Sequence, residues 1–403
     1  MGSLQGTELL APAGNPERLR TAVYFGADAV YFAGKSYGLR AAADNLSYGE
    51  IAEATAYLHA RGKKGYVAVN VFPHAADLDG LHEHALRLQA LGVDAVIAAD
   101  LGVIKYIKKH TGLAVHVSTQ ANVLNPLAAR AYADEGVSRI VLARELTLGE
   151  IGRIADALPP SVGLEAFVHG AMCVSYSGRC LLSNYLLGRD GNNGRCAQPC
   201  RWKYRITEVS RGADTALEMG EDEEGTYILN SRDLNMLAHL QALRDVGVTA
   251  FKIEGRTKTA YYVATVTNAY RRALDGAPLP PLIEELNLAP TRGYTTGFYL
   301  GDGKNATTED TATSKVGAAS RFIAVVTEAY PGGAVVQMRN KFAVGDTLTV
   351  LSPAAVFLKS IKVGRLTDLD GNEVIIADRV CQLLRLSTDV PLSPGDMLRE
   401  SRF

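Results

Sequence analysis

The chain alternates short apolar runs with amphipathic helical patterns, and this alternation limits its possible folds more than any other feature. Eight runs have the length and the β-branched or aromatic content of buried strands. Strands that alternate with helices pair in parallel, and eight is the number that closes a (β/α)8 barrel. We therefore predict a TIM-like barrel with strands at 8–13, 29–33, 64–71, 95–99, 114–119, 139–143, 163–169 and 250–254, and helices at 16–24, 48–61, 78–91, 126–135 and 147–158.

A doubly wound open sheet is the competing architecture. It would normally carry fewer strand and helix units, and residues 12–16 (PAGNP) after the first strand lack the glycine fingerprint of a dinucleotide loop. Composition agrees with a large folded protein, since 42 Lys and Arg balance 43 Asp and Glu and 47% of the 403 residues are hydrophobic. This balance excludes a disordered chain, a coiled coil and a polycation.

No apolar run approaches the roughly 18 residues of a membrane span, and the first residues do not resemble a secretion signal. We therefore expect a soluble cytoplasmic protein with no membrane partner.

The seventh and eighth predicted strands are about 80 residues apart, which is far longer than a usual connection. We interpret residues 171–230 as an insertion after strand 7, with a hairpin formed by 202–208 and 226–230. Helices are expected at 233–245 and 260–274, and Pro278, Pro280 and Pro281 suggest a boundary.

From about residue 321 the pattern changes to short strands separated by glycine turns. This pattern indicates a small antiparallel β-barrel domain, with strands at 321–330, 334–342, 347–351, 357–366, 373–377 and 381–387. The predicted organisation is a catalytic barrel domain at 1–290 that includes the insertion, a linker at 291–320 and the β-barrel domain at 321–403.

Four of the five cysteines, Cys173, Cys180, Cys196 and Cys200, fall within the insertion. Their spacing is C-x6-C, then fifteen residues, then C-x3-C. Four thiolates suit either a structural zinc ion or an iron–sulfur cluster, and the lack of a C-x2-C knuckle favours the cluster. The radical-SAM spacing is excluded because residue 203 is lysine. Cys381 lies in an apolar run and is expected to be a core residue.

Polar residues follow the predicted strands at their carboxyl ends, where α/β barrels place their chemistry. Arginine forks suit carboxylates and phosphates, amides suit the edge of a base, and a histidine can serve as a base, as a donor or as a partner of the metal ligands. The catalytic candidates are Arg144, His169, Glu254 and Arg256, and the substrate-binding candidates are Asn70, Gln120, Arg179 and Lys258.

Each candidate also has a structural interpretation. Glu254 could simply pair with Arg144 or Arg256, His169 could be a core histidine, and the amides of Asn70 and Gln120 could cap neighbouring loops.

Basic residues are dense in and after the insertion and are interleaved with Trp202 and Tyr204, a pattern that fits a polyanion on one face. They are Arg189, Arg195, Arg201, Lys203, Arg205, Arg211, Lys252, Arg256, Lys258, Arg271 and Arg272. No metalloprotease helix and no G-x-S-x-G elbow is present, so the sequence itself supplies no recognisable peptidase centre.

The insertion carries four distinctive segments: 167–173 (FVHGAMC), 176–183 (YSGRCLLS), 194–196 (GRC) and 200–202 (CRW). These segments resemble the collagenase-like peptidase family, peptidase U32, and within it the tRNA-hydroxylating branch. The likeness runs from about residue 8 to 350 through 8–14 (ELLAPAG), 26–31, 227–234, 252–258 (KIEGRTK), 292–298 (RGYTTGF) and 340–346 (NKFAVGD).

The resemblance implies an enzyme that converts the wobble uridine of certain tRNAs to 5-hydroxyuridine without molecular oxygen, with prephenate as the apparent hydroxyl source. It also implies an iron–sulfur cluster, of the [4Fe–4S] type by our interpretation, on Cys173, Cys180, Cys196 and Cys200. The expected partners are tRNA and prephenate, and accessory proteins for cluster assembly; the sequence does not predict the oligomeric state. Three alternatives stay open: a hydroxylase of rRNA or of a quinone precursor, a collagenase-like peptidase, and a zinc-bearing RNA-binding module without catalysis.

Overall fold

The computed structural model describes residues 4–39, 44–173, 180–189, 191, 195–202, 221–222, 225–226, 231–301 and 320–400. Contacts divide this part of the chain into two compact units. The first contains 4–19, the described residues of 27–258, and 291–301; the second contains 20–26, 259–290 and 320–400. In the described part of the chain, no helix combines the length and the apolar character needed to cross a membrane.

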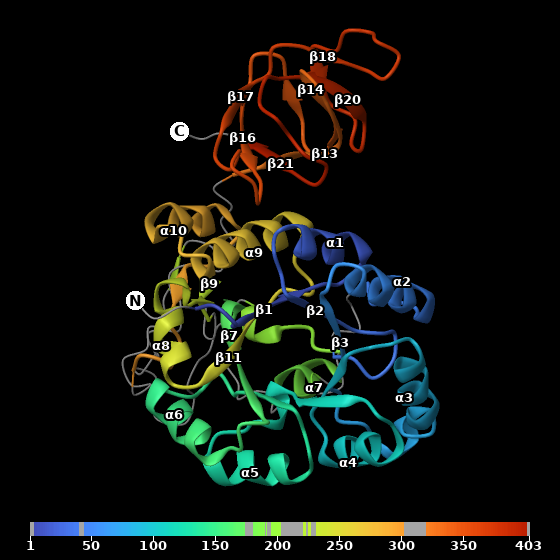
Figure 1. Cartoon of the computed structure of the whole chain (residues 1–403), viewed down its shortest axis with the longest axis vertical. Coiled ribbons are helices and arrows are strands. Elements are labelled where there is room, and N and C mark those ends of the chain that lie inside the picture. Colours follow the sequence, from blue (N-terminus) through green and yellow to red (C-terminus); the bar gives the residue numbers. More distant parts are fainter. Residues whose placement is uncertain are drawn as a thin grey trace. The chain divides into compact units, whose positions relative to one another are not determined.

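The first unit is built on a closed ring of eight parallel strands, as the sequence predicts (Figure 1). The last strand pairs with both the first and the seventh, which closes the ring. The strands are β1 (Glu8–Pro12), β2 (Ala29–Phe32), β3 (Lys64–Val69), β4 (Ala95–Ala98), β5 (Ala114–Val117), β6 (Arg139–Val141), β7 (Gly163–Ala171) and β11 (Val248–Ile253).

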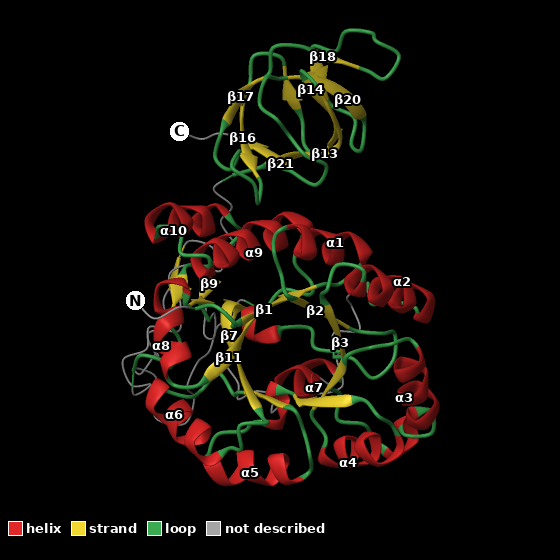
Figure 2. Ribbon diagram, in the orientation of Figure 1, coloured by secondary structure: helices red, strands yellow, loops and turns green. Residues whose placement is uncertain are grey.

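Helices follow most of these strands and surround them (Figure 2). Local sequence sets their starts: Ser47 and Glu50 form a capping box, as do Thr147 and Glu150, and the Asp100 carboxylate accepts a hydrogen bond from the Val103 N–H. The helices are α1 (Pro16–Tyr24), α2 (Tyr48–His59), α3 (Leu81–Ala90), α4 (Leu101–His110), α5 (Pro126–Asp134), α6 (Leu148–Ala157) and α8 (Leu240–Asp245).

The connection between β7 and β11 differs from the prediction. Residues 233–245 are not one helix, because β10 (Asp233–Asn235) pairs antiparallel with β7 before the chain reaches α8. The buried carboxylate of Asp233 accepts a hydrogen bond from Arg292 at 2.9 Å, which compensates for a charge in this short strand. β12 (Tyr294–Thr295) extends the sheet beyond β10. The predicted hairpin strands 202–208 and 226–230 lie almost entirely outside the described residues. Within this connection the structure describes a short antiparallel pair, β8 (Glu221–Asp222) and β9 (Gly225–Thr226).

The second unit contains a seven-stranded antiparallel sheet in the order β17-β16-β21-β13-β14-β20-β18. Its core includes Ile323, Val336, Val350 and Leu384. The strands are β13 (Phe322–Tyr330), β14 (Gly333–Met338), β16 (Thr347–Leu351), β17 (Ser360–Lys362), β18 (Leu366–Thr367), β20 (Leu383–Ser387) and β21 (Met397–Glu400), and a separate pair joins β15 (Phe342–Ala343) to β19 (Ile376–Ala377).

Helices α9 (Ala260–Leu274) and α10 (Leu279–Leu288) belong to this unit. Pro278, Pro280 and Pro281 lie at the start of α10, where proline at the first helical positions costs no hydrogen bond. Arg399 in β21 and Glu285 in α10 form a buried bidentate ion pair.

The expectation for Cys381 is wrong. Its side chain is exposed, and its backbone has φ 63° in the turn before β20, so it is not a core residue.

Candidate active site at the barrel rim

The predicted candidates come from separate strands but share one rim. Asn70 follows β3, Gln120 lies in the 3-10 turn Thr119–Ala121 after β5, Arg144 follows β6, His169 lies near the end of β7, and Glu254 follows β11. Because the strands are parallel and form a closed ring, their carboxyl ends meet at the same end of the barrel.

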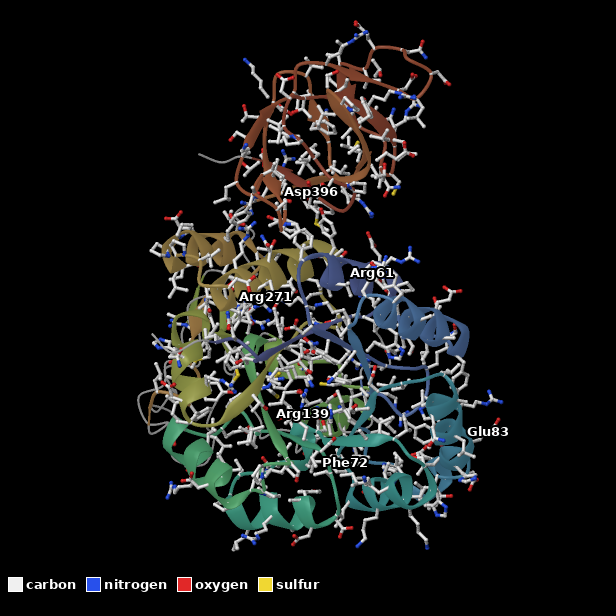
Figure 3. The ribbon with its side chains drawn as sticks, in the orientation of Figure 1. Arg61, Phe72, Glu83, Arg139, Arg271 and Asp396 are labelled. Carbon is white, nitrogen blue, oxygen red and sulfur yellow. The ribbon has the colours of Figure 1, made fainter. Side chains whose placement is uncertain are left out.

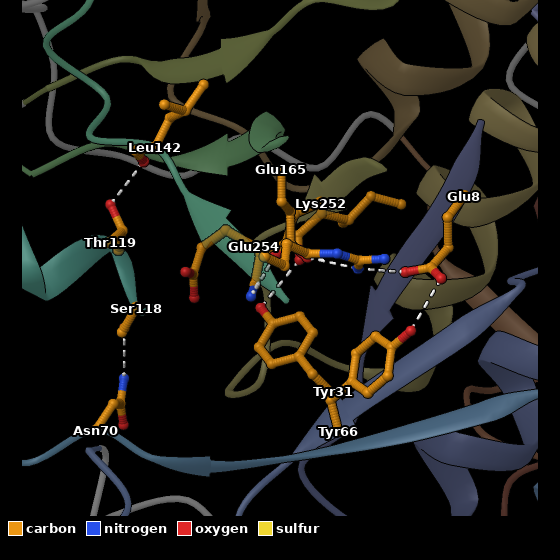
Figure 4. Close-up of polar contacts among 12 residues, drawn as sticks. Glu8, Tyr31, Tyr66, Asn70, Ser118, Thr119, Leu142, Glu165, Lys252 and Glu254 are labelled. Carbon is orange, nitrogen blue, oxygen red and sulfur yellow. Dashed lines mark hydrogen bonds and ion pairs between the residues drawn. The ribbon is translucent and has the colours of Figure 1, made fainter. Parts of the chain in front are cut away.

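Asn70, Ser118 and Gln120 form one hydrogen-bonded group, of which Figure 4 shows the Asn70–Ser118 contact. The Asn70 Nδ2 atom donates to Gln120 Oε1 at 3.0 Å and to Ser118 Oγ at 3.4 Å, and its Oδ1 accepts from the Leu39 N–H at 3.1 Å. Asn70 therefore holds the loop that follows β2, at Leu39, as well as the rim. These bonds involve the Oε1 atom of Gln120 and not its NH2 group, so the NH2 group can donate a hydrogen bond to a ligand at the rim.

Arg144 and Glu254 form the ion pair that the sequence offered as a structural interpretation. Arg144 Nη2 donates to Glu254 Oε2 at 3.0 Å, and its Nη1 donates to the Ala171 carbonyl at 2.6 Å. The guanidinium carbon lies 3.8 Å from the centroid of the Phe167 ring. Within the described residues, the buried Nε atom of Arg144 has no hydrogen-bond partner. Arg144 is thus held rigidly by three groups and keeps one N–H donor unused by them.

His169 is almost fully buried, with 1% of its surface exposed. Burial, together with the positive charge of Lys258, lowers the pKa of His169 to about 3. Its imidazole is therefore neutral at pH 7 and offers one donor and one acceptor. Its ring centroid is 5.3 Å from that of Tyr294, and its backbone carbonyl accepts from the Glu254 N–H at 2.8 Å.

The structure gives the other candidates different settings. Arg256 is buried, and its carbonyl accepts from Arg18 Nη1 at 3.2 Å, while Lys258 is half-buried. Arg179 lies outside the described residues. The predicted basic docking face is corrected in two places, since Lys252 and Arg256 are 3% and 5% exposed and cannot contact a polyanion.

The cysteine-bearing insertion is described from Cys180 to Cys200 with gaps. Cys180 precedes α7 (Leu182–Leu187), and Cys200 lies in the 3-10 turn Pro199–Arg201 that packs against α7. The backbone N–H of Gln198 donates to Cys196 Sγ at 3.3 Å, a kind of contact also made to the sulfurs of iron–sulfur centres. Gly191 lies close to two of these cysteines, since a Cβ added to it would be 3.8 Å from the Cys196 sulfur and 4.0 Å from the Cys180 carbonyl oxygen.

None of the five cysteines forms a disulfide. Among the described residues, no three Cys, His, Asp or Glu side chains are close enough to hold a metal ion. The four thiols of the insertion therefore match a soft metal or a cluster by chemical type, but the structure does not place them as a ligand set.

The sequence analysis missed a buried charged network inside the barrel, which we call the barrel network. Two acids, two bases and two aromatic side chains make it up. Figure 3 labels Arg139, and Figure 4 labels Glu8, Tyr66, Glu165 and Lys252. They are Glu8, Tyr66, His116, Arg139, Glu165 and Lys252.

Glu165 is at the centre of the barrel network and has no exposed surface. It accepts from Lys252 Nζ at 2.7 Å and from Arg139 Nη1 at 3.0 Å, and Arg139 Nη1 also donates to Glu8 at 2.6 Å. Burial acts to raise the pKa of Glu165, but the charges of Lys252 and Arg139 outweigh it and lower that pKa to about 2. Burial lowers the pKa of Lys252, and Glu165 opposes this effect.

The remaining members pack against the ions. The Tyr66 hydroxyl donates to Glu8 at 2.9 Å, and its ring is 4.6 Å from that of His116. Burial and the charge of Arg139 lower the pKa of His116 to about 3. The available signal was a charged residue inside each of two apolar strands, Glu165 in β7 and Lys252 in β11.

The fold and the rim define a (β/α)8 barrel protein whose polar side chains converge at the carboxyl ends of the strands. Residues 14–309 match the model of peptidase family U32, and residues 319–399 match the model of the peptidase family U32 C-terminal domain. The chain belongs to peptidase family U32.

The chain is similar to three curated relatives. The chain is 34% identical to tRNA hydroxylation protein P1 of Bacillus subtilis (strain 168) over 417 residues, covering 98% of this chain and 95% of that protein. It is 35% identical to tRNA hydroxylation protein P of Escherichia coli (strain K12), covering 86% of each. It is also 38% identical to the 23S rRNA 5-hydroxycytidine C2501 synthase of the same bacterium, covering 73% of this chain and 42% of that protein.

Proposed function

We propose that this protein is a tRNA-modifying hydroxylase that converts the wobble uridine to 5-hydroxyuridine. The observation that carries the proposal is the similarity to tRNA hydroxylation protein P1, which extends over 98% of this chain and so includes both units. The rim chemistry is compatible with it, because a uracil ring presents amide-like edges and the Gln120 NH2 group can donate to a carbonyl.

Arg144 is the residue to which we assign the co-substrate. Prephenate carries two carboxylates, and a guanidinium donates to carboxylates in a fixed planar geometry. The ion pair with Glu254 and the bond to the Ala171 carbonyl hold the guanidinium in place, and the 12% of the side chain that stays exposed is the part that an acid can reach. In this proposal the hydroxyl oxygen comes from prephenate and not from molecular oxygen. His169, neutral at pH 7 and buried behind the rim, positions Glu254, because its carbonyl accepts from the Glu254 N–H at 2.8 Å.

The proposal includes an iron–sulfur cluster, of the [4Fe–4S] type, on Cys173, Cys180, Cys196 and Cys200, with zinc as the alternative. Such a cluster would supply electron transfer. The support is the donor type and the N–H that faces Cys196 Sγ, and no step at the rim is assigned to the cluster. Iron and sulfide analysis of anaerobically purified protein separates the two metals, since a colourless zinc protein would contradict the cluster.

The test of function is nucleoside mass spectrometry of tRNA from a strain that lacks the gene and any paralogue. We expect 5-hydroxyuridine and its derivatives to disappear and to return with the wild-type gene, but not with Arg144→Lys, which cannot make the same two bonds. Arg87→Lys is the matched control, because Arg87 is exposed on α3, where it pairs with Glu83 and lies over the Tyr48 ring, and it is not one of the rim residues. Unchanged 5-hydroxyuridine in the deletion strain would refute the proposal.

Hydroxylation of rRNA is the second candidate, and the similarity to the 5-hydroxycytidine synthase favours it. That similarity covers 73% of this chain, against 98% for the tRNA hydroxylation protein. Mass spectrometry of rRNA from the same strains tests it directly.

A further inference from the structure

Helix α7 exposes apolar and aromatic side chains that a folded protein normally buries. Tyr185 is 87% exposed and Leu181 69%. The Tyr185 N–H donates to the Leu181 carbonyl at 2.8 Å, so the two residues lie one turn apart on the same side of the helix. Leu186 and Leu187 are partly exposed too, but they follow Tyr185 directly and so point to other sides of the helix. Clustered apolar exposure of this kind marks an interaction surface.

Trp202 belongs to the same surface. It follows the turn Pro199–Arg201, which packs against α7, and its side chain is 43% exposed. The Ala197 N–H donates to the buried Ser183 hydroxyl at 3.0 Å, which ties this turn to the inner side of α7. The backbone therefore fixes the turn that leads into Trp202 against α7.

Two arginines border this surface. Arg189, just past the end of α7, donates through Nε to the Arg195 carbonyl at 3.0 Å, and both side chains are exposed. The charge of the wider segment has the same sign: residues 171–211 contain seven Lys and Arg against two Asp and Glu, a net charge of +5, whereas the whole chain has −1. A polyanion is the partner that this charge complements.

We propose that this surface, the α7 face (Leu181, Tyr185, Trp202, Arg189 and Arg195), docks unpaired bases of an RNA loop. The inference rests on the proposed function and identifies where the anticodon loop is held. Unpaired bases stack on tyrosine and tryptophan rings, and arginines beside the rings contact the phosphates. A paired stem cannot offer its bases in this way, so the α7 face selects the loop.

The test uses the full-length protein, purified anaerobically, and a fluorescein-labelled RNA stem-loop with unmodified uridine at the wobble position. Anisotropy gives the affinity, and the fluorescence of Trp202, the chain's only tryptophan, reports contact at the α7 face itself. We expect Tyr185→Ala to weaken binding roughly 5- to 150-fold, the value of one lost stacked base. Tyr185→Phe, which keeps the ring, should bind like the wild type.

Leu127→Ala is the matched control, since Leu127 is 83% exposed on α5 and lies outside the α7 face. Circular dichroism and thermal unfolding check that each variant is folded. The proposal is overturned if Tyr185→Ala binds the stem-loop within about twofold of the wild type, or if a fully paired duplex binds as tightly as the stem-loop. A Trp202 response to anionic vesicles without one to RNA would overturn it in favour of a membrane surface.

Nucleoside analysis of tRNA separates this inference from the proposed function. If the wild type restores 5-hydroxyuridine in cells and Tyr185→Ala restores it equally, the α7 face is wrong and the function stands. If the wild type binds the loop through Tyr185 but no cell tRNA contains 5-hydroxyuridine, the function is wrong and the docking surface stands.

Discussion

Replacing Glu165 by glutamine removes one of the four charges of the barrel network and keeps the shape of the side chain. In the wild type, Glu165 and Glu8 balance Arg139 and Lys252 within a buried set of contacts of 2.6 to 3.0 Å. In Glu165→Gln the two bases face a single acid, so one positive charge is left uncompensated inside the barrel.

The size of the effect follows from this imbalance. Removing one partner of a buried ion pair costs about 3–5 kcal/mol, because the remaining charge stays desolvated. At roughly 2–4 °C per kcal/mol for a unit of this size, we expect the barrel to unfold about 6–20 °C earlier.

Thermal unfolding followed by circular dichroism at pH 7 measures the shift, and a second transition that belongs to the second unit should not move. Glu83→Gln is the control, since this carboxylate is 69% exposed on the outside of α3 and pairs only within one helix turn with Arg87 (Figure 3). We expect a change of less than about 1 kcal/mol for it.

A double variant tests the reasoning further. Adding Lys252→Met to Glu165→Gln restores a balance of one acid and one base, so the two changes together should cost less than their sum by about 0.5–3 kcal/mol. The prediction is refuted if Glu165→Gln unfolds at the same temperature as Glu83→Gln. It is also refuted if the double variant loses as much stability as the two single variants added together.

The other predictions concern His169, the second unit and the cysteines. Because the pKa of His169 is lowered to about 3, below the roughly 6.5 of an unfolded histidine, the neutral ring stabilises the barrel above pH 6.5 and this stability is lost as pH falls toward 3. His169→Gln should show a shallower fall of melting temperature over that range, and an equal fall would contradict the assignment. Arg399→Met leaves Glu285 buried without its partner and should lower the second transition by about 3–5 kcal/mol without moving the first, as differential scanning calorimetry would show. Cys196→Ser should lower the iron content and the visible absorption of anaerobically purified protein, whereas Cys381→Ser should not; equal loss in both would argue against an assigned ligand.

The sequence predicted the barrel well because its signals are local. Each buried strand is an apolar run whose period needs no knowledge of its neighbours, and the helix starts carry their own caps, such as Ser47 and Thr147. The short strand β10 was missed because Asp233 is tolerated there only through Arg292, which lies 59 positions away. β21 was missed for the same kind of reason, since the buried Arg399 interrupts its apolar pattern.

The rim residues could be found from the sequence because strand ends are predictable, but their contacts could not. Glu254 and Arg144 are 110 positions apart, and only the closed ring of strands brings them to 3.0 Å. The barrel network escaped for the same reason, because Glu8 and Arg139 are 131 positions apart. A charge in an apolar strand indicates that a partner exists without indicating which residue it is.

The position of β21 in the second unit has a consequence for synthesis. This strand lies between β13 and β16, pairs with both, and is the last of the seven to be made. Until residue 400 leaves the ribosome, β13 and β16 each have an unpaired edge, and Glu285 lacks its ion-pair partner Arg399. The sheet therefore forms in two halves that join late. A nascent chain that stalls before β21 would expose two unpaired strand edges, which chaperones or other incomplete copies of the chain could bind.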